Sequence, residues 1–359
     1  MDYQHLTHYY KGKKVFLTGH TGFKGSWLLY WLHMLGAEVK GYSLPPLNEF
    51  DLYHKIHGNS LCHSIISDIR NGEQLSQEIL SFEPDFIFHL AAQPLVKLSY
   101  EIPSETFAVN TLGTANLLDA VRHLKKQCSV ILVTTDKVYE NKEWYYPYRE
   151  TDVLGGYDPY SASKACAELV INSFRNSFFN TSEYSKHGKG IASARAGNVI
   201  GGGDWSKDRI IPDIIRALSK NEPVSVRNPL SVRPWQHVLE PLGGYLHLGA
   251  KLSDNPTRFS ESWNFGPNPE DNLTVEELVH LAIELWGSGS YKKTQLVDQP
   301  HEAGLLKLDI NKTTNLLGWT PKYNASEAVN KTVEWYKNDL EGNDNFIGEQ
   351  VKAFQEQND

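Results

Sequence analysis

A tyrosine and a lysine four residues apart, Tyr160 and Lys164, are the residues in this sequence best suited to acid–base chemistry. Side chains at positions i and i+4 share one face of a helix, so the phenol and the amine are expected to be neighbours. A free tyrosine ionises at about pH 10, so it accepts a proton at neutral pH only if its anion is stabilised, as a nearby ammonium group does. The pair is therefore a candidate for removing the proton of a secondary alcohol.

Position distinguishes this pair from others with the same spacing. Two tyrosines in a polar N-terminal arm, within residues 1–14, stand at the same distance from a lysine, and a surface tyrosine and lysine would show the spacing as well. Tyr160 instead opens a helix between two expected parallel strands, at residues 130–133 and 191–195. Thr135 leaves the first of these strands at its carboxyl end, where open parallel sheets bind their ligands. Thr135 can therefore hydrogen-bond the hydroxyl that Tyr160 deprotonates.

A strand, a glycine turn and a helix begin the folded part of the chain. Residues 15–17 favour a strand, Gly19, Gly22 and Gly25 follow, and apolar residues then recur at helical intervals as far as residue 35. Glycine lets backbone N–H groups approach a pyrophosphate, and a helix N-terminus adds unpaired donors and partial positive charge. The turn therefore predicts a dinucleotide site. A simple tight turn would also use glycines, and the spacing differs from the tighter Gly-x-Gly-x-x-Gly of many dehydrogenases.

The second strand, expected over residues 37–43, ends at Ser43. Many NAD-binding proteins place an acidic residue here for the adenosine ribose, whereas NADP-binding proteins place an arginine near the 2′-phosphate. This sequence has neither, because Leu44, Pro45 and Pro46 follow Ser43. We expect NAD rather than NADP as the cofactor.

These motifs resemble the extended short-chain dehydrogenase/reductase family, most of whose members act on nucleotide-activated sugars. The resemblance extends over about residues 13–321 and is carried by residues 18–28, 134–141 and 197–205. Asp136 and Lys137 are similar to the acid and base that follow the strand-end threonine in the nucleotide-sugar 4,6-dehydratases of this family, where the pair is usually Asp-Glu. Lysine at the second position resembles the members that act on CDP-glucose.

The resemblance implies a dehydration in three stages. Tyr160 accepts a proton while NAD oxidises carbon 4 of the hexose, and the resulting ketone acidifies the proton on carbon 5. Lys137 then removes that proton, Asp136 protonates the departing carbon-6 hydroxyl, and the hydride returns to carbon 6. A lysine base must be neutral, which burial or a neighbouring positive charge such as Lys164 favours. The alternative is that Lys137 only binds the substrate.

The resemblance also assigns the residues of the site. The catalytic set is Thr135, Asp136, Lys137, Tyr160 and Lys164. The cofactor set is Gly19, Thr21, Gly22, Phe23, Lys24, Gly25, Ser43, Asp68, Ile69, Leu90, Ala91, Ala92, Gln93, Asn110, Thr134, Tyr160 and Lys164. The substrate set is Gln93, Asn198, Arg209, Arg233, Asn264, His301 and Glu302. Arginine suits a pyrophosphate because its guanidinium group matches the anion's geometry, although a single arginine is more often a surface residue.

Alternating strands and helices up to residue 195 predict an α/β fold with a doubly wound parallel sheet of modified Rossmann type. We expect residues 1–196 to form an NAD-binding domain. Residues 197–359, broken by glycines and prolines, are expected to form mainly a smaller α/β nucleotide-sugar-binding domain, with a segment at about 232–262 returning to the first domain. Within the first domain we expect a third strand at residues 60–67, a fourth at 86–90 and a long helix at 104–126. The residues after 341 are polar and are expected to be peripheral.

Composition argues against several other classes of protein. The net charge is −8 without a basic stripe, so nucleic acid is not expected as a partner. No apolar run approaches the roughly 20 residues that cross a bilayer, and the first ten residues lack a signal-peptide core, so we expect a cytoplasmic protein without membrane contact. Three cysteines far apart and no complete ligand cluster predict neither disulfides nor a metal site.

Assembly and the alternative functions follow from the same resemblance. It implies a homodimer or homotetramer paired through the helices at residues 104–126 and 160–179, in a bacterial route to the dideoxy sugars of lipopolysaccharide O-antigen. A nucleotide-sugar 4-epimerase, or a 4,6-dehydratase for another nucleotide, would share NAD, Tyr160 and Lys164, but an epimerase would not need Asp136 and Lys137. A dinucleotide sensor without catalysis would not need Tyr160.

Overall fold

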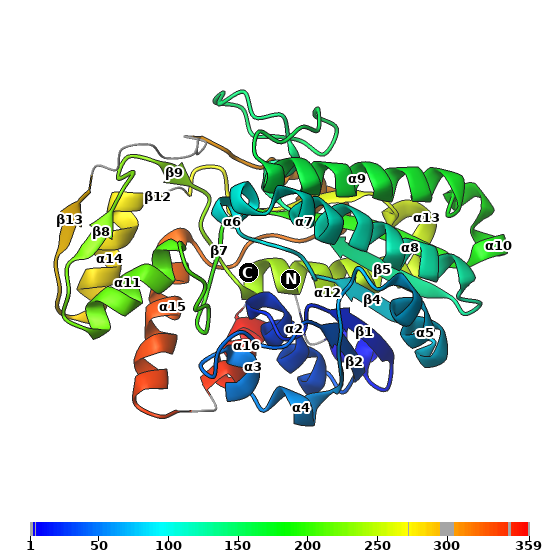
Figure 1. The fold of residues 1–359 in the computed structure, drawn as a ribbon, viewed down its shortest axis with the longest axis horizontal. Coiled ribbons are helices and arrows are strands. Elements are labelled where there is room, and N and C mark those ends of the chain that lie inside the picture. The colour runs from blue at the N-terminus through cyan, green and yellow to red at the C-terminus, as the bar shows by residue number, and fades with distance from the viewer. Residues whose placement is uncertain (1–2, 4, 272, 295–304, 344–345, 358–359) are drawn as a thin grey trace.

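The computed structural model describes residues 3, 5–271, 273–294, 305–343 and 346–357 (Figure 1). Seven parallel strands form one sheet in the order β11-β6-β5-β4-β1-β2-β3. In chain order they are β1 (Lys14–Thr18), β2 (Glu38–Ser43), β3 (His63–Ile66), β4 (Phe86–His89), β5 (Cys128–Val133), β6 (Lys189–Ala196) and β11 (Ser262–Phe265). The prediction of an α/β fold with a doubly wound parallel sheet is confirmed.

Apolar side chains cover both faces of this sheet, because neighbouring residues of a strand point in opposite directions. Phe16, Ile87 and Val130 lie in one buried cluster, whereas Leu17 and Ile131, each one residue further along its strand, lie in another. The first cluster is covered by α5 (Gly72–Phe82), α8 (Gly113–His123) and α9 (Pro159–Ser177), and the second by α2 (Phe23–Met34) and α12 (Leu239–Asp254). Two covered faces explain why these strands are almost wholly apolar.

The C-terminal part of the chain contributes to the same sheet and also builds a separate lobe. α12 contacts β5 and β6, and β11 pairs with β6, so α12 packs on the large sheet and β11 is its edge strand. The lobe on the left of Figure 1 contains α11 (Ile210–Ser219), β8 (Val224–Val226), α14 (Val275–Trp286), β13 (Tyr291–Lys293) and α15 (Ala325–Leu340). The division of the chain at residue 196 into two domains stays a prediction.

Both ends of the described chain pack against the core, so two expectations were wrong. The N-terminal segment is not a polar arm, because α1 (Leu6–Tyr10) buries Leu6 and Tyr10, and the Tyr10 hydroxyl donates to the Leu246 carbonyl at 2.7 Å. The segment after residue 341 is not peripheral, because α16 (Phe346–Glu356) buries Phe354, whose ring lies 5.8 Å from that of Trp31. In both cases a few apolar residues at helical spacing outweigh a polar average composition.

Two other elements differ from the expected ranges. The long helix expected at residues 104–126 is divided into α7 (Pro103–Phe107), a π-helical turn at Ala108–Leu112 and α8, and Asn110 lies in that turn. The third strand is shorter than expected, because α4 (Gly58–Leu61) occupies its first residues. π-Helical turns frequently occur at functional sites.

Glu240 makes the stability of this fold depend on pH. Its side chain on α12 is fully buried, and Oε1 accepts hydrogen bonds from the backbone of Lys322 and Tyr323 at 2.9 and 2.7 Å. Burial raises the pKa of Glu240 to about 8. The folded protein therefore holds a proton that the unfolded chain releases above about pH 4.3.

We expect the free energy of unfolding to decrease as pH rises from about 4.3 to 8, and Glu240→Gln to remove that part of the decrease. Urea denaturation of both proteins at several pH values measures the free energy of unfolding. A constant difference between the two proteins at every pH would contradict the assignment.

Candidate active site

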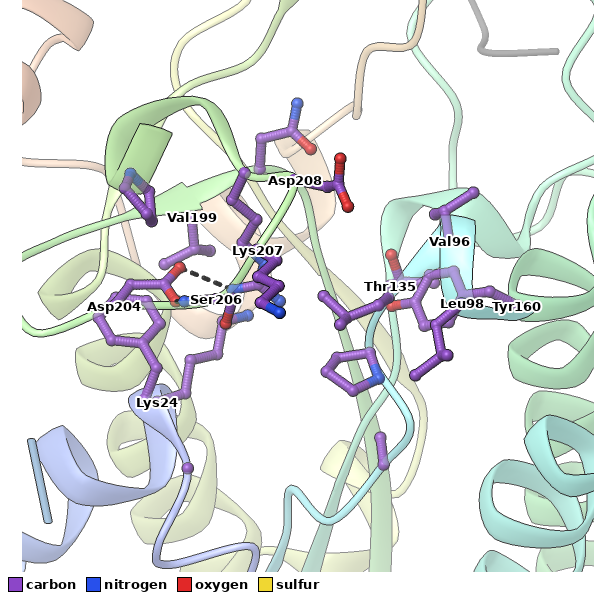
Figure 2. Close-up of a pocket in the computed structure, with 18 of the residues that line it drawn as sticks. Lys24, Val96, Leu98, Thr135, Tyr160, Val199, Asp204, Ser206, Lys207 and Asp208 are labelled. Carbon is purple, nitrogen blue, oxygen red and sulfur yellow. Dashed lines mark hydrogen bonds and ion pairs between the residues drawn. The ribbon is translucent and has the colours of Figure 1, made fainter. Parts of the chain in front are cut away.

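A cavity of about 2290 Å³ lies beyond the carboxyl ends of the central strands. Its walls come from the turn between β1 and α2, the residues after β2, β4 and β5, the first turn of α9 and the segment that leads into α11. In Figure 2, Thr135 and Tyr160 lie on one side of this space, and Lys24, Asp204 and Lys207 lie on the other. The large sheet and the C-terminal lobe both contribute to the cavity.

The glycine turn has the geometry of a phosphate-binding turn. Gly19 has a φ of +76°, and a Cβ there would lie 2.8 Å from the Ala91 backbone nitrogen. A Cβ on Gly25 would lie 1.9 Å from the Gly19 carbonyl oxygen, so both positions require glycine for the turn itself. Gly22 differs, because a Cβ there would meet only that same oxygen at 3.5 Å, and Gly22 begins α2 without a side-chain cap. The open side of Gly22 and the uncapped helix start fit a pyrophosphate.

Gly22→Val should therefore prevent NAD binding and leave the fold intact. The added methyl groups enter the cavity where the pyrophosphate would lie, because, apart from the two chain neighbours of Gly22, a Cβ at this position meets only the Gly19 carbonyl oxygen within 4 Å in the described part of the chain. Fluorescence titration with NAD and thermal unfolding of the empty protein measure the two effects. Gly25→Ala is the comparison, since its Cβ overlaps Gly19 and should lower the melting temperature. Unchanged NAD affinity in Gly22→Val would reject this turn as the cofactor site.

The other expected cofactor positions divide into those that line the cavity and those that do not. The lining positions, besides the glycine turn, are Ser43, Asp68, Ile69, Leu90, Ala91, Ala92, Thr134, Tyr160 and Lys164. Thr21 shares a hydrogen bond with Ser43 at 2.8 Å, which joins the glycine turn to the end of β2. Asp68 is paired with Arg70 at 2.6 Å.

Gln93 and Asn110 are not among the residues that line the cavity. The Asn110 side chain accepts from the Gln93 backbone N–H at 2.9 Å and donates to the Gln93 carbonyl and the Ser163 hydroxyl at 3.1 and 2.9 Å. Both residues are buried. Their hydrogen bonds connect the segment after β4 to α9, so these two residues hold parts of the cavity wall in place without facing the cavity.

Thr135, Tyr160 and Lys164 line the cavity together. The Lys164 Nζ donates to the Val133 carbonyl at 3.3 Å, which holds α9 against the end of β5. Burial lowers the pKa of Lys164 to about 8, against the opposing charge of Glu168. Burial also raises the pKa of Tyr160 above its usual value, while the charge of Lys137 and a hydrogen bond with Thr135 act in the opposite direction. Further positive charge near the phenol would favour its anion.

Asp136 and Lys137 follow immediately and face the same cavity. The Asp136 Oδ1 accepts from the Thr135 hydroxyl at 3.0 Å and from the Lys137 Nζ at 3.2 Å. Its Oδ2 is buried and has no hydrogen-bond partner in the described part of the chain. Lys137 Nζ also donates to the Asn198 side-chain oxygen at 3.3 Å, and about a third of the Lys137 side chain is exposed. The site thus contains a partly exposed amine and, beside it, a buried carboxyl oxygen that accepts no hydrogen bond from the described part of the chain.

The expected substrate contacts are only partly brought together. Asn198, Arg209 and Arg233 line the cavity, and Arg209 is paired with Asp204 at 2.8 Å. Asn264 does not line it, because its amide is buried and bonds Tyr148, Asp309 and Tyr139 within the core. His301 and Glu302 lie outside the described residues.

Several charged residues of the cavity wall were not predicted from the sequence. They are Lys97, Asp204, Lys207, Asp208, Arg216 and Arg227. The density of basic residues between positions 207 and 227 was the available signal. Beneath the site, Glu168 and Arg195 form a buried ion pair at 2.8 Å, and Glu168 accepts from the Thr134 hydroxyl at 2.5 Å. This pair holds the end of β5 in place, and no local pattern indicated it.

Known proteins share both the sequence and the fold. The chain is 50% identical over 339 residues to CDP-glucose 4,6-dehydratase of Salmonella typhimurium, covering 94% of each protein. It is 27% identical to CDP-paratose 2-epimerase of Salmonella typhi, covering 90% of this chain and 98% of the relative. The crystal structure of dTDP-glucose 4,6-dehydratase from Streptomyces venezuelae with NAD bound matches with a TM-score of 0.77 at 23% identity, covering 92% of this chain and 98% of that one.

The family described as GDP-mannose 4,6 dehydratase matches residues 16–332, which include the glycine turn, Asp136, Lys137 and Tyr160. That match covers most of the chain and every wall of the cavity named above. The chain therefore belongs to the GDP-mannose 4,6-dehydratase family, whose fold is that of the extended short-chain dehydrogenases/reductases.

Proposed function

We propose that this protein is a hydro-lyase that converts CDP-D-glucose to CDP-4-keto-6-deoxy-D-glucose with NAD as its cofactor. The observation that supports it most is that Asp136 and Lys137 face the same cavity as Thr135 and Tyr160. An epimerase of the same fold needs a proton acceptor for one hydroxyl, whereas loss of water also needs a base for carbon 5 and an acid for carbon 6. The relative with 50% identity carries the same activity in its name.

The glycine turn, Ser43 and the segment Leu90–Ala92 would hold the cofactor. Bound NAD supplies a hydride acceptor at carbon 4 of the sugar and returns the hydride at carbon 6. Because the two transfers cancel, the protein should need no fresh NAD in each turnover. Asp68 and Ile69 would lie against the adenosine end, since they follow β3 at the same edge of the sheet.

The chain's own residues would perform the proton transfers. Tyr160 accepts the proton of the carbon-4 hydroxyl, and Thr135 orients that hydroxyl by sharing a hydrogen bond. Lys137 would remove the proton of carbon 5 and, when the hydride adds to carbon 6, return a proton to carbon 5. Asp136 would give a proton to the carbon-6 hydroxyl, so that the C–O bond breaks and water leaves, and the proton that Tyr160 accepted would replace it. Lys164 supplies positive charge beside the phenol.

The substrate's diphosphate would lie between Arg209 and Arg233, which offer guanidinium groups from the C-terminal part of the chain. Asn198, which already holds Lys137 at 3.3 Å, would position that amine. Incubation with CDP-, UDP-, GDP- and dTDP-glucose, followed by detection of a 4-keto-6-deoxy product, tests the function. A 4-epimer as the product, or no reaction with CDP-glucose, would overturn it.

A search of the described helices finds none that could span a bilayer.

Assembly into a homo-oligomer is part of the proposal. α8 and α9 contact each other and, with the residues flanking them, present Leu112, Leu169 and Phe178 to solvent, each between 44% and 58% exposed. A second copy would cover these side chains. We expect sedimentation to show a dimer or tetramer, and Leu169→Glu to shift it toward monomer. A monomer at working concentration in the unmodified protein would reject this pairing.

A further inference from the structure

Lys24 is a basic residue of the cavity wall that no carboxylate in the described part of the chain pairs with. It lies in the first turn of α2, between Gly22 and Gly25 of the glycine turn. Among the described residues, its amine makes no hydrogen bond or ion pair that would hold it in place. The lysine also stands at the positive end of the helix dipole, where a cation is unfavourable. A bound anion would offset the cost of holding an unpaired amine at the N-terminus of a helix.

The charged groups around Lys24 add to the excess of positive charge. Arg209 acts on it most strongly, followed by Asp136, Lys164 and Lys137, of which only Asp136 is an anion. Asp136 is already shared with Lys137, and the nearby Asp204 is bonded to Arg209 and to the Ser206 backbone. In Figure 2 the Lys24 side chain lies on the same side of the cavity as Asp204 and Lys207. Each of these two carboxylates already accepts a hydrogen bond from another cation through one of its oxygens.

We propose that Lys24 and Arg209 together bind one diphosphate group in this cavity, so that the glycine turn and the segment leading into α11 hold the same anion. The proposal rests on the proposed function, which offers two sources of that chemistry: the pyrophosphate of the cofactor and the diphosphate of the nucleotide sugar. Lys24 belongs to the turn expected to bind the first, whereas Arg209 belongs to the segment expected to bind the second. A shared anion would couple the binding of the two molecules.

Binding of an anion beside Lys24 should be accompanied by proton uptake. Burial, with Arg209 as the next cause, lowers the pKa of Lys24 to about 7, so at pH 8 the amine is mostly neutral in the empty cavity. A diphosphate beside it favours the charged form and raises that pKa. Binding at pH 8 should therefore take up close to one proton per site. Arg209 stays charged throughout and takes up none.

Calorimetric titration at pH 8 in two buffers of different ionisation enthalpy tests the proposal. CDP and NAD are titrated separately into the unmodified protein and into Lys24→Met, Lys24→Arg and Lys207→Met. We expect Lys24→Met to lose about 10- to 100-fold in affinity and the proton uptake. Lys24→Arg should keep the affinity without proton uptake, because its charge is permanent. Lys207→Met removes one exposed charge from the same wall and should retain both properties.

The two ligands separate the possible sources of the anion. A loss confined to CDP assigns Lys24 to the nucleotide sugar, a loss confined to NAD assigns it to the cofactor, and a loss for both indicates a shared site. If Lys24→Met bound both ligands with the affinity and the proton uptake of the unmodified protein, the proposal would be overturned. If the unmodified protein bound NAD but not CDP, the proposed substrate would fail and the NAD titration would still decide the role of Lys24. Thermal unfolding should show Lys24→Met at least as stable as the unmodified protein, since it removes a cation from the helix N-terminus.

Discussion

Tyr160→Phe should reduce product formation by roughly 10²–10⁴-fold or more, because it removes the group that accepts the carbon-4 proton and leaves the ring in place. The phenol lies on the cavity wall, one helical turn before Lys164 and within reach of the Thr135 hydroxyl. The substitution removes one oxygen and no packing volume. NAD binding and the melting temperature should therefore remain close to those of the unmodified protein.

A nearby tyrosine provides the control for this experiment. Tyr157 also lines the cavity, but its side chain is 78% exposed and it precedes the helix that carries Tyr160. Tyr157→Phe should retain most of the activity. The assay is the rate of 4-keto-6-deoxy product formation at saturating CDP-glucose. If Tyr160→Phe formed product at a near-normal rate, another group would have to be the proton acceptor.

Substitution of Asp136 or Lys137 should separate the elimination step from the oxidation step. Asp136→Asn and Lys137→Met should each slow the loss of the carbon-6 hydroxyl by roughly 10²–10⁴-fold. Neither should necessarily stop the oxidation at carbon 4, which belongs to Tyr160. Absorbance of reduced cofactor that depends on substrate can therefore persist in these variants. Asparagine keeps the hydrogen bond that Asp136 Oδ1 accepts from Thr135, so the local structure should survive the first change.

Exchange with deuterated water identifies the base. The unmodified protein should incorporate solvent deuterium at carbon 5, and Lys137→Met should lose this exchange. Lys137→Arg is the matched variant, because it keeps a cation beside Asp136 and Asn198 but cannot lose its proton at neutral pH. Exchange at the normal rate in Lys137→Met would mean that Lys137 is not the base and serves only to bind the substrate.

The features that sequence patterns predict correctly in this protein are local. The apolar runs of β1, β4 and β5 and the glycines after β1 predict the strands, the turn and their order without reference to any distant residue. The four-residue spacing of Tyr160 and Lys164 places both on one face of α9, and that face lines the cavity. These features depend on the periods of strands and helices, which short segments of sequence contain.

For other polar residues, the tertiary structure determines whether they face the cavity. Asn264 was an expected substrate contact, yet its amide is surrounded by Tyr139, Tyr148 and Asp309, which the fold brings together from two other segments. α1 and α16 are buried because the fold brings them against helices from other parts of the chain, as in the contacts of Tyr10 with Leu246 on α12 and of Phe354 with Trp31 on α2. Lys24 is buried in a largely positive environment because the fold brings Arg209, far along the chain, to the same cavity. Burial and local charge arise from contacts between distant segments, so the spacing of residues within one segment does not predict them.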